Sequence, residues 1–289
     1  MRKIIYITIM FVFAAITVPS AALAAPSNKP SRPGGSGTTE LIGYDVSYPQ
    51  CGRTLPTNHA FAVIGVNGGT AAVGNDCLAQ QFLWAKKASG LANQPPVQVY
   101  VNTANPGELI NEISTWPTNN TDASNYTPTN TYGNTCTGAN DLSCSWMYGW
   151  NRAYAADNSY FKSAAQTAGI STLTKDYTWW LDVETMNTWQ TGSTDALKRN
   201  VAALEGWTSY FKHHGGKVGL YSTAYQWGEI TGNYISSTSN LRALPNWRPS
   251  GATLANAKKN CNVAPLTIGG FVSMTQYVKN NLDHNHSCI

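Results

Sequence analysis

Short apolar runs alternate with segments of helical periodicity along most of the chain. The apolar runs lack a polar face, which is typical of strands buried on both faces of a parallel sheet. We predict strands at residues 41–46, 61–66, 97–101, 178–183, 217–223, 244–247 and 271–277. Apolar spacing, capping residues and terminal glycines predict helices over residues 75–89, 151–168 and 193–214. The alternation predicts an α/β fold with parallel strands, closed as a single TIM-like (β/α) barrel and surrounded by helices.

One long segment departs from this alternation. Residues 116–145, here called the excursion, consist mostly of Asn, Thr, Ser, Gly and Pro and contain Cys136 and Cys144. Loops of this length in compact domains are usually functional or disordered. A disulfide within the excursion would make it an ordered wall or lid over a site.

The start of the chain has the pattern of a cleaved secretory signal. Arg2 and Lys3 precede an apolar run over residues 4–18, and Ala22-Leu23-Ala24 has the small-x-small pattern of a cleavage site. The apolar run is too short to span a membrane, although a retained anchor is the alternative. We therefore expect residues 1–24 to be removed and the protein to be secreted, with no membrane association afterwards.

Two further regions follow the expected signal. Residues 25–40 are rich in Pro, Gly and Ser, which predicts a flexible linker. Residues 41–289 have a length that is ordinary for one α/β barrel domain.

Six cysteines lie in this domain, and an even number in an exported chain indicates disulfides. Pairing of sequence neighbours is favoured among the possible connectivities, which gives Cys51–Cys77, Cys136–Cys144 and Cys261–Cys288.

Charge and motifs exclude several classes of function. The formal net charge is +4, falls to +2 when Arg2 and Lys3 leave, and comes from scattered residues, so nucleic acid is not an expected partner. The chain has no CxxC pair, phosphate-binding loop or Gly-x-Ser-x-Gly motif, and the His284 and His286 pair is a weak metal candidate. We expect no cofactor and no metal.

Acidic residues stand where two of the predicted strands end. Asp182 and Glu184 are two residues apart, so they face the same way, at the edge where parallel barrels hold their active sites. Asp45 occupies the equivalent place at the carboxyl end of the first strand, and Asp283 follows the last one. Neighbouring carboxyls do not both ionise readily, so Glu184 is expected to hold a proton while Asp182 stays ionised. Such a pair can cleave a glycosidic bond, although two acids at a strand end can equally be structural.

The motifs around these acids resemble those of the family 25 glycoside hydrolases, which are lysozyme-type muramidases with an irregular α/β barrel. The resemblance rests on "DVSYPQ", "LDVET", "TQY…LDHN" and the segment "LEGWTSYFKHHGGKVGLYST". The family's Asp-Trp after the first motif and its tryptophan before Gln-Tyr are missing, so the chain is more similar to a divergent relative. The resemblance implies that Glu184 is the acid, with Asp182 and Asp45 as its catalytic partners.

The same resemblance suggests which residues contact a glycan. Asp283, Gln276, Tyr277 and Tyr221 lie in the matching motifs, and Trp189 is the preferred sugar-stacking residue because it lies beyond the strand end. Two classes of function follow: a secreted, monomeric glycosidase that cleaves a cell-wall, peptidoglycan-type polysaccharide, or a non-catalytic glycan-binding or surface protein on the same barrel. Hydrolysis of peptidoglycan distinguishes them.

Overall fold

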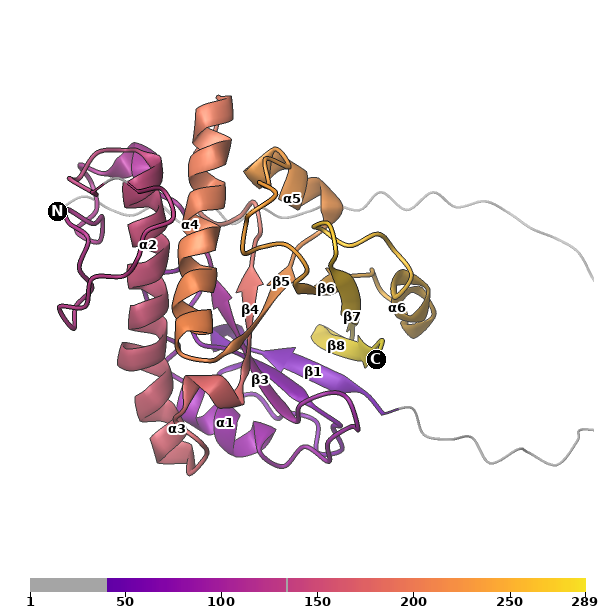
Figure 1. Cartoon of the computed structure of the whole chain (residues 1–289). Coiled ribbons are helices and arrows are strands. Elements are labelled where there is room, and N and C mark those ends of the chain that lie inside the picture. Colours follow the sequence, from indigo (N-terminus) through magenta and orange to yellow (C-terminus); the bar gives the residue numbers. More distant parts are fainter. Residues whose placement is uncertain (1–40, 134) are drawn as a thin grey trace, which may run out of the picture. The chain divides into compact units, whose positions relative to one another are not determined.

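The computed structural model describes residues 41–133 and 135–289. The expected signal (1–24) and linker (25–40) lie outside the described residues. The described chain forms a closed barrel of eight strands that follow one another in sequence order around the barrel (Figure 1). The strands are β1 (Gly43–Val46), β2 (Ala62–Gly65), β3 (Val97–Asn102), β4 (Thr178–Asp182), β5 (Lys217–Tyr221), β6 (Pro245–Pro249), β7 (Phe271–Lys279) and β8 (Leu282–Ser287). The predicted α/β barrel is therefore confirmed.

The sequence predicts a barrel of parallel strands only, but one strand of the observed barrel is antiparallel. The strands β1 to β7 pair in parallel, but β8 is antiparallel to both β7 and β1 and closes the barrel between them. Asn280 and Asn281, with φ of 53° and 55°, form the two-residue turn of the β7–β8 hairpin. Positive φ at both positions is what a type I′ hairpin turn requires, and asparagine tolerates it well. The apolar pattern does not predict β8. Asp283 therefore lies within a strand, and not after the last one as expected.

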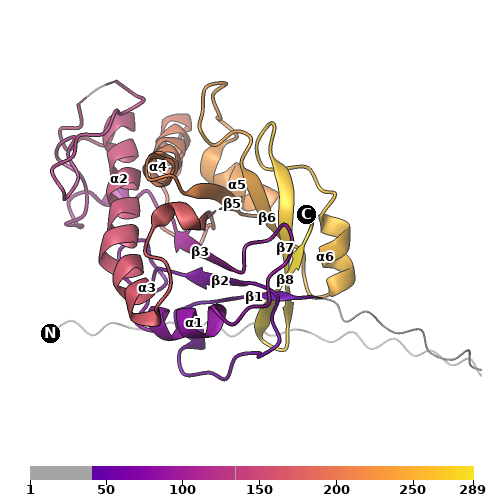
Figure 2. The same ribbon diagram turned by 60° about the horizontal axis from the view of Figure 1, so that its bottom comes forward.

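Helices surround the barrel, and two of them, Ala224–Thr231 and Leu254–Asn260, have no counterpart in the sequence prediction. They are α1 (Leu78–Ala85), α2 (Leu142–Ala155), α3 (Lys162–Ala168), α4 (Thr194–His213), α5 (Ala224–Thr231) and α6 (Leu254–Asn260). A π-helical stretch, Ala156–Phe161, joins α2 to α3, and 3-10 turns occur at Tyr48–Gln50, Gly107–Leu109 and Thr174–Asp176. Figure 2 shows α1 and α3 on one side of the barrel and α6 on the opposite side.

The largest error in helix placement concerns α2. The sequence predicts a helix from residue 151, but α2 begins at Leu142, inside the excursion. Asp141 caps it by accepting a hydrogen bond from the Cys144 amide at 2.8 Å. A side-chain oxygen at this position satisfies an amide that has no partner within the helix.

The strand residues alternate between two cores. On β4, Trp179 faces outward and stacks on Phe211 of α4 with ring centroids 4.2 Å apart. Its neighbour Trp180 faces the barrel interior, where its indole Nε1 donates to Gln98 Oε1 at 2.9 Å. Because side chains on a strand alternate, Asp182 shares the inward face with Trp180. This register brings the acid to the barrel mouth.

Helices α2 and α4 lie side by side in Figure 1 and cross at two glycines. A Cβ atom on Gly149 would overlap the Ala203 carbonyl oxygen, and one on Gly206 would overlap the Trp146 carbonyl oxygen. The two helix backbones are therefore in direct contact. Any residue larger than glycine at either position would push the helices apart.

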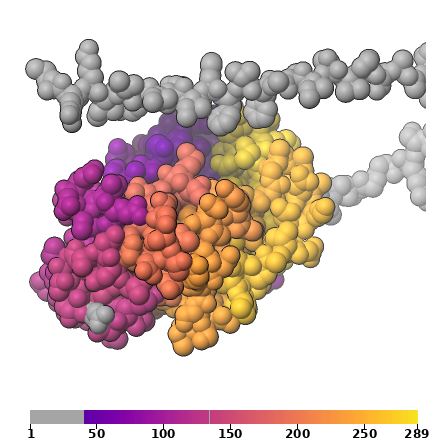
Figure 3. Space-filling view, turned by 90° about the horizontal axis from the view of Figure 1, so that it is seen from above, coloured from indigo at the N-terminus to yellow at the C-terminus, as the bar shows by residue number. Residues whose placement is uncertain are grey.

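The excursion covers α2 from the outside. Trp116 stacks on Tyr148 and Tyr126 stacks on Trp150, with ring centroids 5.6 and 6.0 Å apart. Figures 1 and 3 show this magenta segment on the side of the domain away from the yellow C-terminal strands. The described residues contain three disulfides, each between cysteines that are neighbours in sequence: Cys51–Cys77, Cys136–Cys144 and Cys261–Cys288.

Candidate active site

Inward-facing side chains at the carboxyl ends of the parallel strands line a pocket of about 320 Å³. Its lining residues are Asp45, Tyr100, Asp182, Glu184, Tyr221, Trp247, Gln276, Val278 and Asp283. Four of them are acids, supplied by β1, β4, the loop after β4, and β8. The structure thus brings together the acids that the sequence singles out, with Gln276 and Tyr221 beside them. None of the lining residues belongs to the excursion, so the expectation of a wall or lid over the site was wrong.

The two acids of the Asp-x-Glu motif differ in burial. Asp182 is 7% exposed, and its Oδ1 atom has no hydrogen-bond partner among the described residues. Burial raises the pKa of Asp182 well above its ordinary value, and the charges of Glu184 and Asp45 add to this. An environment of this kind favours the neutral carboxylic acid.

Glu184 is half-buried at the rim of the pocket. Burial raises its pKa, the charge of Asp283 raises it further, and a hydrogen bond from Gln226 of α5 acts in the opposite direction. Asp283 on β8 supplies the repelling charge that raises the pKa of Glu184, while the repulsion between Glu184 and Asp182 raises the pKa of Asp182. A carboxyl with a raised pKa and solvent access can act as a general acid.

Asp45 is as buried as Asp182 but is surrounded by donors. Gln276 Nε2 lies 3.2 and 3.0 Å from its two carboxyl oxygens, and Asn285 Nδ2 lies 2.6 Å from Oδ1. The pKa of Asp45 is raised well above its ordinary value by burial and then by the charge of Asp283, although these donors act in the opposite direction. Asn285 was not identified from the sequence, because its inward orientation depends on β8, which the apolar pattern does not reveal.

Each amide is held in turn by a second donor. Trp247 Nε1 donates to Asn285 Oδ1 at 2.8 Å, and the Tyr221 hydroxyl donates to Gln276 Oε1 at 2.8 Å. The pocket wall and the acid cluster are therefore one hydrogen-bonded unit.

Two predicted substrate-binding residues lie elsewhere. Trp189 packs against the outer core, and its Nε1 donates to the Glu184 carbonyl oxygen at 2.9 Å, so it supports the loop that carries the acid. Tyr277 is buried and faces away from Gln276, with its ring 5.0 Å from that of His284. Neither lines the pocket.

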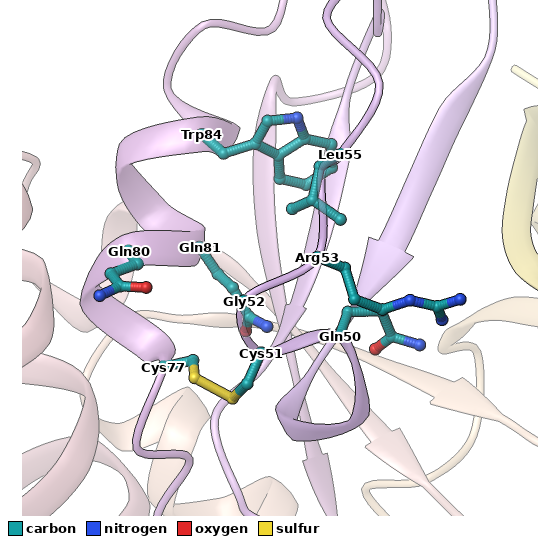
Figure 4. A pocket seen from close by; sticks show the side chains of 9 residues that line it. All are labelled: Gln50, Cys51, Gly52, Arg53, Leu55, Cys77, Gln80, Gln81 and Trp84. Carbon is teal, nitrogen blue, oxygen red and sulfur yellow. A yellow bond between two sulfur atoms is a disulfide. The ribbon is translucent and has the colours of Figure 1, made fainter.

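A second pocket lies beside the Cys51–Cys77 disulfide (Figure 4). Its only charged lining residue is Arg53, so it offers no acid pair.

Within residues 41–133 and 135–289, no His, Cys, Asp and Glu group is arranged to hold a metal ion. None of the helices found there has the length and apolar character needed to cross a membrane.

One family model matches part of the chain. Residues 154–260, which include Asp182 and Glu184, match the family model described as Lysozyme-like protein 1. This part of the chain is therefore similar to that family. The match supports the lysozyme-like resemblance of the motifs but does not extend to family 25 in particular.

Two solved structures match parts of the chain. A muramidase from Trichobolus zukalii is 15% identical with a TM-score of 0.45, over 86% of this chain and 93% of that one. A D-tagatose 3-epimerase-like protein is 10% identical with a TM-score of 0.29, over 67% of this chain and 57% of that one. No curated protein matches the sequence.

Proposed function

We propose that this protein is an exported glycoside hydrolase that cleaves a peptidoglycan-type glycan. The observation that carries the proposal is the pocket itself: four carboxyls converge at the mouth of a barrel, and Glu184, one of the two that are half-buried, has a raised pKa. The lysozyme-like segment contains two of these acids. Three disulfides fit an oxidising compartment, in accord with removal of residues 1–24 on export.

In this proposal Glu184 donates its proton to the glycosidic oxygen as the bond to the anomeric carbon breaks. The positive charge that develops on the sugar ring is stabilised by the negative charge of the acid cluster beneath it. Asp182 orients the N-acetyl group of the substrate, and Asp45 tunes the pair. Tyr100, Tyr221 and Trp247 supply aromatic surface against which a sugar ring can pack.

The test is hydrolysis of purified peptidoglycan by wild type and by Glu184→Gln. The amide keeps the shape of the side chain but cannot donate the acid proton, so turnover should fall by at least ~10²-fold while glycan binding persists. Glu205→Gln is the matched control, since Glu205 is another glutamate whose pKa is raised by burial but lies on α4, outside the pocket. Undiminished turnover in Glu184→Gln would refute the acid assignment. Glycan binding without hydrolysis by wild type would favour the non-catalytic alternative.

A further inference from the structure

Two hydrogen-bond chains end on Asp45, and the first has only one possible direction. An indole N–H can donate but cannot accept, so the atom of Asn285 that faces Trp247 Nε1 at 2.8 Å must be the amide oxygen. The amide nitrogen of Asn285 then faces Asp45 Oδ1, 2.6 Å away. An amide nitrogen can only donate, so Asp45 must accept at this oxygen.

The second chain reinforces the first. With the Gln276 amide nitrogen between the two oxygens of Asp45, its own oxygen accepts from the Tyr221 hydroxyl at 2.8 Å. Both oxygens of Asp45 therefore face donors. Hydrogen bonds donated to a carboxyl group favour its ionised form, because they are stronger to a charged oxygen than to a neutral one.

Asp182 has the opposite surroundings at the same depth. The two aspartates are 6% and 7% exposed, but Asp182 Oδ1 has no donor among the described residues. Each aspartate also faces one further acid: Asp283 on β8, with His284 beside it, raises the pKa of Asp45, and Glu184 after β4 raises the pKa of Asp182. Tyr100 on β3 and Tyr221 on β5 face both aspartates. The two aspartates therefore differ in their amide donors, and both of these donors, Gln276 and Asn285, face Asp45.

We infer that Asn285 and Gln276 are positioning residues that keep the buried negative charge of the site on Asp45, which leaves Asp182 as a neutral acid. This reverses the expectation that Asp182 stays ionised. A neutral carboxylic acid can donate, so Asp182 would present an O–H to an acceptor on the substrate. The carbonyl oxygen of an N-acetyl group is such an acceptor. That consequence rests on the proposed glycosidase function, whereas the charge assignment does not.

Titration of the full chain with ¹³C-labelled aspartate tests the assignment without any activity measurement. In wild type the Asp45 carboxyl should ionise at lower pH than the Asp182 carboxyl. Asp182→Asn then exchanges one neutral group for another, so the Asp45 midpoint should move by less than ~0.3 unit. Asp45→Asn removes a charge, so the Asp182 midpoint should fall by at least about one unit. The reverse pattern, equal shifts, or no shift in either variant would overturn the inference.

The orienting role of Trp247 has its own test. Trp247→Phe removes the donor that fixes the Asn285 amide, so ionised Asp45 is less stabilised and its midpoint should rise by about half a unit or more. Trp227→Phe is the matched control, because Trp227 is equally buried but belongs to the outer core. A rise of the same size in both variants, or in neither, would show that Trp247 only fills space. Loss of peptidoglycan hydrolysis would leave both titrations readable, so a failure of the proposed function is distinguishable from a failure here.

Discussion

A buried acid that keeps its proton makes folding stability depend on pH, and Asp182 is the acid in this site best suited to show it. Its pKa is raised by burial and by the charges of Glu184 and Asp45, so over a range of pH the folded protein holds a proton that the unfolded chain has released. The free energy of unfolding then falls as pH rises from the ordinary aspartate pKa of about 3.9 towards the raised folded value. The slope is about 1.4 kcal/mol per pH unit for each retained proton.

Asp182→Asn removes that proton from both states, so the variant should lose this part of the slope. Each pH unit above about 4.5 should widen the stability advantage of the variant over wild type by about 1.4 kcal/mol, or roughly 3–5 °C in Tm for a domain of this size. Urea unfolding at closely spaced pH values measures the effect. The free energies of unfolding of the two proteins are compared with the same slope m of free energy against urea concentration. Asp76→Asn, at an exposed position, is the control and should leave the slope unchanged. Parallel stability curves for wild type and Asp182→Asn would refute the argument that Asp182 is protonated in the folded state.

Three further predictions follow from the packing. Gly206→Ala should lower the free energy of unfolding by about 1–3 kcal/mol, because its Cβ meets the backbone of α2, whereas Gly228→Ala on α5 has free space and should be neutral or stabilising in the same urea assay. Replacing Cys136 and Cys144 together by alanine should cost roughly 2–3 kcal/mol, and peptide mapping of the unreduced wild type should find the pair linked. Trp189→Phe should lower turnover by roughly 2–10-fold with unchanged glycan binding, because it removes one hydrogen bond to the loop of the acid; weakened binding instead would indicate a stacking role.

The acid cluster can be predicted from the sequence because its placement follows from two simple rules. Strand alternation places Asp182 and Glu184 on one face, and the parallel barrel places Asp45 at the same edge. Both rules act locally, within one strand and its end. The charge environment does not follow from them, since Asp283 and Asn285 reach the site through β8, on a polar strand whose "LDHNHS" pattern has no apolar signal.

The remaining errors have similar causes. Helix α2 begins in a segment whose overall polar composition hides its first turns, although Asp141 is a good capping residue and Trp146 and Met147 are buried. Trp189 is predicted to stack on a sugar because it lies beyond the strand end, but whether a side chain at such a position faces the pocket or the outer core depends on the path of the loop. No pattern of hydrophobicity encodes that path.

The hydrogen bond between Asn285 and Asp45 joins residues 240 positions apart in the sequence. Pairing of β1 with β8 closes the barrel at the same place, so the site draws on both ends of the described chain. Contacts of such long range form late, because the entropy of closing the intervening loop must first be overcome. A nascent chain that lacks β8 can hold neither the complete acid cluster nor the donors that organise it. Assembly of the pocket therefore has to wait until β8 has been synthesised and has paired with β1.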